Sequence, residues 1–99
     1  MAADDLRSKL SAAQQEALRV GDSPLRADAL ADRVPALARD LAASDVTDEV
    51  KARVGAELQA AERVLRRDDD GREAARHLQN ALRWVEDRPR RPSPFLDDD

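Results

Sequence analysis

The stretch TDEVKARVGAELQAAERVLRR, residues 47–67, predicts a long amphipathic helix. Its large apolar residues and one alanine recur at intervals of three and four, at Val50, Val54, Leu58, Ala61 and Leu65. That spacing places them on one face of an α-helix and leaves the charged residues on the others. Thr47 stands before the stripe as an N-cap, with the acidic Asp48 and Glu49 in the first turn. Gly55 lies inside this helix, and it either permits a close helix contact or is an exposed glycine that a long helix tolerates.

Two similar patterns precede this stretch. Leu6, Leu10, Ala13, Ala17 and Val20 predict a helix over residues 4–20, which Gly21 ends as a C′ residue. Ser23 and Pro24 then predict the start of a second helix, because serine caps and proline fits the first helical position. The apolar line of this helix is Leu30, Val34, Leu37 and Leu41, with Leu25 at its entry.

Pro35 interrupts the second apolar line. A proline inside a helix removes one amide donor and clashes with the preceding turn. We therefore expect either a kink near residues 31–34 or two shorter helices that meet there.

A fourth helix follows the acidic turn at residues 68–71. Asp70 and Glu73 have the spacing of a capping box, and Pro89 ends the pattern, which predicts a helix over residues 72–88. The stripe of this helix consists of Ala74, Leu78, Ala81, Leu82 and Val85.

Four amphipathic helices with short links favour an all-α, up-down four-helix bundle with a thin, alanine-rich core. We expect residues 1–88 to form this bundle and residues 89–99 to form a flexible tail rich in proline, arginine and aspartate. The chain has no cysteine, which excludes disulfides and thiolate metal sites.

The sequence contains no pattern that assembles a catalytic or cofactor site. His77 is the only histidine, and with Glu73 it would provide two metal ligands where a site needs three or more. With three glycines in the chain, a phosphate-binding loop is not expected either. We therefore predict no enzymatic activity, no cofactor and no metal, and we expect His77 to lie at the surface or at the edge of the core.

Charge favours a protein partner over a nucleic acid. The chain carries 17 basic and 21 acidic residues, for a formal net charge of −4, whereas phosphate binding needs a basic face. An arginine strip along the third and fourth helices keeps a nucleic-acid-associated regulator as the alternative function. It comprises Arg63, Arg66, Arg67, Arg72, Arg76 and Arg83, and Arg88, Arg90 and Arg91 continue it.

Two features predict where a protein partner binds. Trp84, flanked by Arg83 and Arg88, is either a residue at the core edge or an interface anchor, since tryptophan and arginine dominate binding hot spots. In the tail, Phe95 and Leu96 stand between prolines and an acidic end, as in a short linear motif. Alternatively, Phe95 folds back onto the bundle. Partner identity and self-association stay open.

Three segments, at residues 43–46, 58–65 and 74–78, are similar to the FIMAH domain, a helical module of bacterial secreted proteins. The resemblance covers residues 37–85, and it implies an accessory, non-catalytic interaction module. The sequence departs from the pattern at Asp45, where the family usually has glycine.

The composition also predicts where the protein resides. Residues 1–5, MAADD, are acidic and precede no apolar run, so no signal peptide is expected. No stretch approaches the ~18 consecutive apolar residues of a membrane helix. We expect a soluble cytoplasmic protein, and the abundance of alanine, arginine and aspartate suggests a bacterium with a GC-rich genome.

Overall fold

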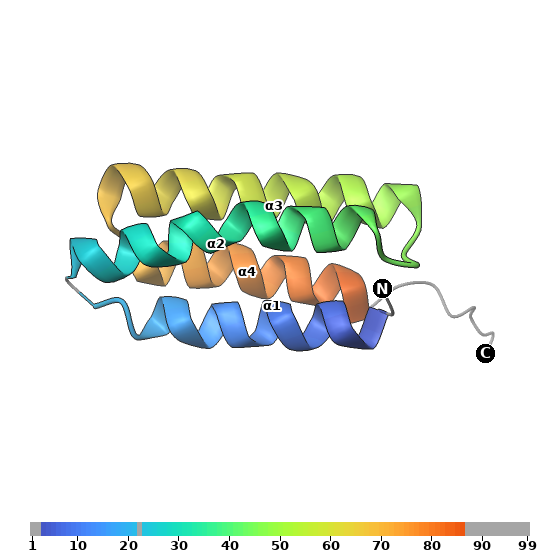
Figure 1. Ribbon diagram of the computed structural model, residues 1–99, viewed down its shortest axis with the longest axis horizontal. Helices are drawn as coiled ribbons and strands as arrows, with labels where there is room; N and C mark the ends of the chain where they lie inside the picture. The colour runs from blue at the N-terminus through green and yellow to red at the C-terminus, as the bar shows by residue number, and fades with distance from the viewer. Residues whose placement is uncertain (1–2, 22, 87–99) are drawn as a thin grey trace, which may run out of the picture.

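Four α-helices account for most of the computed structural model, which describes residues 3–21 and 23–86. They are α1 (Ala3–Leu18), α2 (Pro24–Ala42), α3 (Asp48–Asp68) and α4 (Gly71–Glu86). The helices run alternately in opposite directions along one axis (Figure 1), and no strand occurs within the described ranges. The predicted all-α, up-down four-helix bundle is confirmed.

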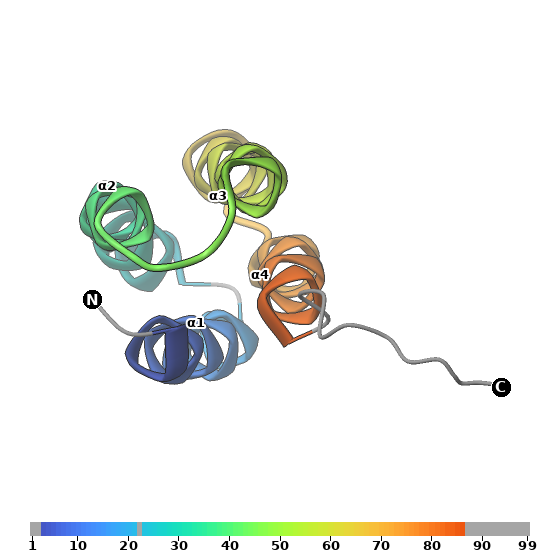
Figure 2. The same ribbon diagram turned by 90° about the vertical axis from the view of Figure 1, so that its right-hand side faces the viewer.

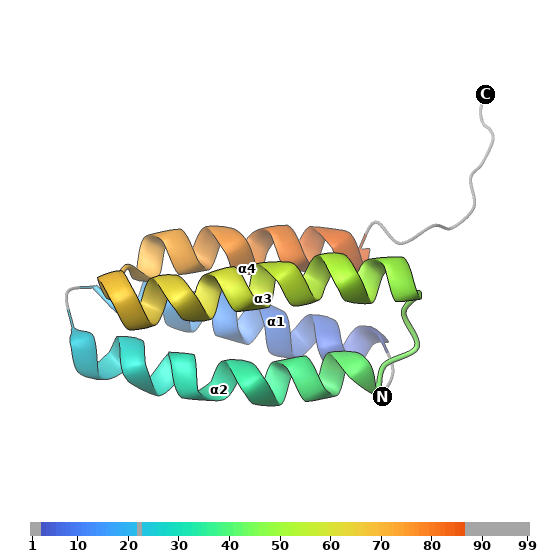
Figure 3. The ribbon, with the colours of Figure 1, turned by 90° about the horizontal axis from the view of Figure 1, so that it is seen from above.

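The helices occupy the corners of a square when the bundle is viewed along its axis (Figure 2). Neighbours in the chain are neighbours in space, and α4 closes the square by packing on α1. The contact between α1 and α2 is the least extensive of the four. Figure 3 shows from above that α1 begins and α4 ends at the same end of the bundle.

The core consists of the predicted stripes together with Ala27, Ala31, Val46 and Ala75, which the stripes did not include. All the stripe residues are buried except Leu82, which is partly buried against the core. Leucine and valine fill most of the core, and alanines occupy the remaining positions.

Local sequence signals define the helix starts. The side-chain oxygens of Ser23 and Thr47 accept hydrogen bonds from the amides of Arg26 and Val50, each at 3.2 Å. The Asp70 carboxylate does the same for the Glu73 amide at 3.0 Å. Each bond satisfies an amide that has no partner within its helix, so these three predicted caps are confirmed.

The end of α1 comes two residues earlier than predicted. The amides of Arg19 and Val20 bond to carbonyls three residues back, which tightens the chain into a turn. Gly21 follows with a φ of +56°, a conformation that glycine adopts without steric cost. Val20 is nevertheless buried, as the stripe predicted.

At Pro35 the structure excludes one of the two alternatives for α2, and at Leu25 the expectation was wrong. The helix is continuous through Pro35, so the alternative of two shorter helices is excluded. Leu25 is 81% exposed instead of joining the apolar line. It lies five residues before Leu30, and at 3.6 residues per turn this separation rotates it about 140° away from the stripe.

The glycines of α3 and α4 differ in their packing. Gly71, expected in a turn, is the first residue of α4 and is buried against α1. A β-carbon on Gly71 would stand 2.3 Å from the Ala17 carbonyl oxygen, closer than van der Waals contact allows. A β-carbon on Gly55 would have only ordinary contact with Leu41, at 3.9 Å. The close helix contact therefore occurs at Gly71.

Candidate functional site

Polar side chains from α3 and α4 meet along the outer line where these two helices pack. We call this group the α3–α4 seam, and it consists of Arg53, Glu57, His77, Asn80, Arg83 and Trp84.

Trp84, predicted either at the core edge or as an interface anchor, is one of the exposed large apolar residues in the described part of the chain. The Arg53 guanidinium carbon lies 5.3 Å from the centroid of its ring, which is the distance of a cation–π interaction. The residue as a whole is 36% exposed. Arg53 therefore packs over the ring of a large aromatic side chain at the surface.

His77 connects the two helices one to two turns further along the seam. Its Nδ1 lies 2.8 Å from Oε1 of Glu57, and both side chains are 24% exposed. Its Nε2 lies 3.5 Å from Oε2 of Glu73 on α4. This position at the edge of the core confirms the prediction for His77.

The two carboxylates approach different nitrogens of the His77 ring, so they do not converge on one point. Within residues 3–21 and 23–86, no group of three or more histidine, aspartate or glutamate side chains is placed to hold a metal ion. The geometry here is that of a contact between helices, since Glu57 and His77 are directed at one another.

A surface depression of about 420 Å³ opens beside this contact. Glu57 lies on its α3 side, and Asn80, Arg83 and Trp84 line its α4 side. Arg83 forms no ion pair with the part of the chain that the structure describes. The structure thus brings Trp84 and Arg83 together, while Arg88, Phe95 and Leu96 lie outside the described residues.

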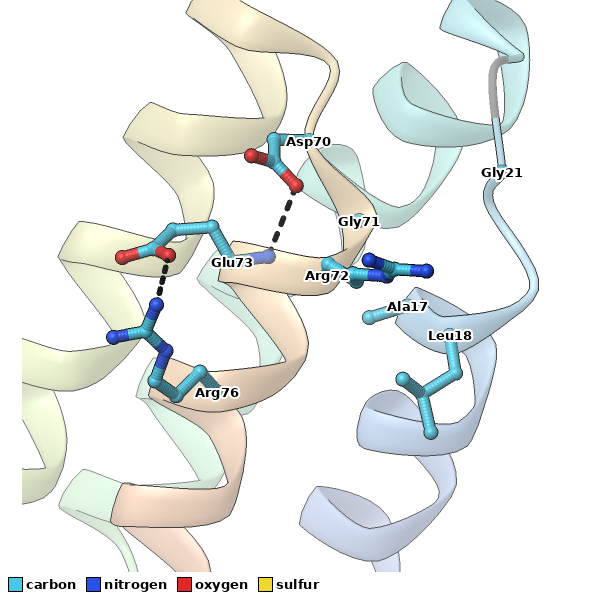
Figure 4. A pocket seen from close by; sticks show the side chains of 8 residues that line it. All are labelled: Ala17, Leu18, Gly21, Asp70, Gly71, Arg72, Glu73 and Arg76. Carbon is cyan, nitrogen blue, oxygen red and sulfur yellow. Dashed lines mark hydrogen bonds and ion pairs between the residues drawn. The ribbon is translucent and has the colours of Figure 1, made fainter.

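A second depression, of about 640 Å³, lies between the end of α1 and the start of α4. Figure 4 shows that its acidic groups are already engaged, since Asp70 caps the Glu73 amide and Glu73 pairs with Arg76 at 2.8 Å. Leu18, 60% exposed, borders it from α1. This site therefore consists of a helix cap and its surroundings.

The predicted arginine strip is divided among different faces. Arg66 turns toward α2 and pairs with Glu62 at 3.0 Å and with Asp32 at 3.1 Å. The hydrogen bond to Glu62, which has the larger effect, and the hydrogen bond to Asp32 both raise the pKa of Arg66. Arg72 and Arg76 border the depression at α1, whereas Arg83 belongs to the seam. Acidic neighbours thus pair with Arg66 and Arg76, and Arg83 borders a different depression from Arg72 and Arg76.

No family model, curated protein or solved structure matches the chain. The resemblance to the FIMAH domain therefore stays a prediction. None of the helices in the described ranges combines the length and the hydropathy that crossing a bilayer demands.

Sequence reasoning missed Asn80 on the α4 side of the seam, and on the α3 side it missed Arg53 and Glu57. They are four residues apart on α3, directly before the core positions Val54 and Leu58. This spacing places both side chains on one edge of the buried stripe. The sequence predicted which residues lie on this edge of α3. It did not predict that α4 packs beside this edge, or which face of α4 turns toward it.

Proposed function

We propose that the protein is a non-enzymatic interaction module, a small adaptor or regulatory subunit, that binds a partner protein through α4 and the C-terminal tail. The observation that carries the proposal is the position of Trp84. The only tryptophan of the chain is partly exposed at the surface, and Arg53 packs over its ring. Trp84 and Arg83 line the same depression. Tryptophan and arginine in such positions contribute most of the affinity at many interfaces.

The absence of assembled chemistry in the seam also supports binding rather than catalysis. Glu57 and His77 are directed at one another at 2.8 Å, and Arg53 covers one side of the Trp84 ring. A general acid or base must instead face the space where a substrate is held. The proposed role of the seam is to present a rigid aromatic and cationic surface.

The tail provides the second part of the proposed interface. Phe95 and Leu96 are the only large apolar residues in residues 89–99, and Arg88 lies directly before that segment. An apolar anchor with charges on either side is the composition of a linear binding motif.

A capture experiment tests this proposal. The tagged full-length chain and its Trp84→Ala variant are used as baits in extracts of the source organism, and captured proteins are identified by mass spectrometry. We expect Trp84→Ala to lose a protein that the unchanged chain retains, since truncation of a hot spot costs about 2 kcal/mol or more, roughly a thirtyfold loss of affinity.

Leu25→Ala is the matched control, because Leu25 is also an exposed, large apolar residue but lies at the opposite end of the bundle. We expect this variant to capture the same protein as the unchanged chain. Equal capture by all three baits, with circular dichroism showing equal helix content, would contradict the proposed surface.

A further inference from the structure

The exposed side of Trp84 lies close to the point where the described part of the chain ends. Trp84 precedes the last residue of α4, Glu86, by two positions, and Asn80 precedes it by six. The depression of about 420 Å³ beside them has no occupant among residues 3–21 and 23–86. An aromatic residue left 36% exposed at such a site is suited to pack against another apolar side chain.

The charges around this depression favour an acidic occupant. Arg53 and Arg83 flank Trp84, and neither forms an ion pair with a described residue. The one carboxylate that lines the depression, Glu57, is directed at His77. A ligand with an apolar group followed by carboxylates would therefore pack on the Trp84 ring and pair with the two guanidinium groups.

The chain carries a segment of this composition itself. Phe95 and Leu96 are followed directly by three aspartates, residues 97–99. Phe95 follows Glu86 by nine positions, and at about 3.3 Å per residue this connection spans roughly 30 Å. Asn80 precedes Glu86 by six positions of α4, which span only about 9 Å. The tail is therefore long enough to turn back and reach the depression.

We propose that Phe95–Asp99 docks in cis on the α3–α4 seam, with Phe95 against Trp84 and the aspartates near Arg53 and Arg83. The partner then meets α4 and the tail as one continuous surface. Docking in the free protein also orders the tail before the partner arrives, which lowers the entropic cost of binding. The inference rests on the proposed function because it assigns this surface to the partner interface. The test of tail docking needs no partner, so tail docking and partner binding can fail separately.

The fluorescence of Trp84 reports on this docking directly, because the chain has no other tryptophan. The experiment compares acrylamide quenching and the emission maximum of the full-length chain with those of the double variant Phe95→Ala, Leu96→Ala. Ser93→Ala is the matched control within the tail. We expect the double variant alone to show stronger quenching and a red-shifted emission, with unchanged helix content by circular dichroism.

Charge and concentration complete the test. Replacing the aspartates at positions 97–99 by asparagine should weaken the protection of Trp84, and added salt should weaken it only in chains that keep the aspartates. Equal quenching of the unchanged chain and the double variant would overturn the inference. Protection that disappears on dilution, together with a dimer in sedimentation experiments, would also overturn it, since the tail would then dock on a second copy.

Discussion

Gly71 and Ala17 bring α4 and α1 into contact at the backbone. A β-carbon on Gly71 would lie 2.3 Å from the Ala17 carbonyl oxygen and 2.7 Å from the β-carbon of Val20. Both of these atoms belong to positions with little freedom to move, since Ala17 and Val20 are themselves buried. The start of α4 can therefore reach α1 only with glycine at this position.

The two helical glycines should respond in opposite ways to the same substitution. We expect Gly71→Ala to lower the free energy of unfolding by about 1–3 kcal/mol, the cost of overpacking a rigid site. Gly55→Ala should raise it by about 0.5–1 kcal/mol, because the added methyl group fits and the unfolded chain loses freedom. Urea unfolding followed by circular dichroism measures both. Two changes of the same sign would refute this account of the packing.

The adjacent aspartates of the α3–α4 turn provide another matched pair. Asp70 caps the Glu73 amide, so Asp70→Ala should cost about 1 kcal/mol of stability. Asp69 has a φ of +52°, so Asp69→Gly should gain up to about 1 kcal/mol by relieving the left-handed backbone. Each variant removes one negative charge, and a charge effect alone would therefore shift both midpoints in the same direction.

The contact between Glu57 and His77 should contribute measurably to stability. We expect a double-mutant cycle with Glu57→Gln and His77→Gln to give a coupling energy of about 1 kcal/mol, because the 2.8 Å hydrogen bond is largely shielded from solvent. The same cycle on the exposed pair Arg7 and Asp4 should give less, about 0.2–0.5 kcal/mol. Similar values for the two pairs would show that the seam does not anchor α3 to α4.

Leucines on opposite faces of α2 should differ sharply in their effect on stability. Leu30 is 1% exposed, and Leu30→Ala should cost about 2–5 kcal/mol. Leu25→Ala should change stability by no more than about 0.5 kcal/mol, because the side chain already lies in water. Thermal unfolding of both variants checks the assignment, and a large loss for Leu25→Ala would place that residue in an interface.

The sequence was sufficient to predict the fold because its signals are local. Apolar intervals of three and four define one face of each helix, and capping residues such as Thr47 define where a helix starts. Leu25 shows the limit of this reasoning. It stands next to an apolar line in the sequence, but its position around the helix axis places it opposite the core.

The seam required the tertiary structure. Trp84 and Arg83 were predictable as a candidate surface from residue type, whereas Arg53 and Glu57 became part of it only when α3 packed beside α4. The requirement for glycine at position 71 could not be predicted either, because it depends on how α4 packs against α1. Its cause lies in Ala17, more than fifty residues earlier in the chain.

The even number of antiparallel helices has a consequence for attachment. Ala3 and Glu86, the first and last residues that the structure describes, lie at one pole of the bundle, so a protein joined directly at both of these residues would lie at that pole (Figure 1). The opposite pole, where Leu18 and Leu25 are 60% and 81% exposed, would then point away from the attached protein. The bundle is thus suited to insertion into a surface loop of a host domain, where both junctions require only a short span.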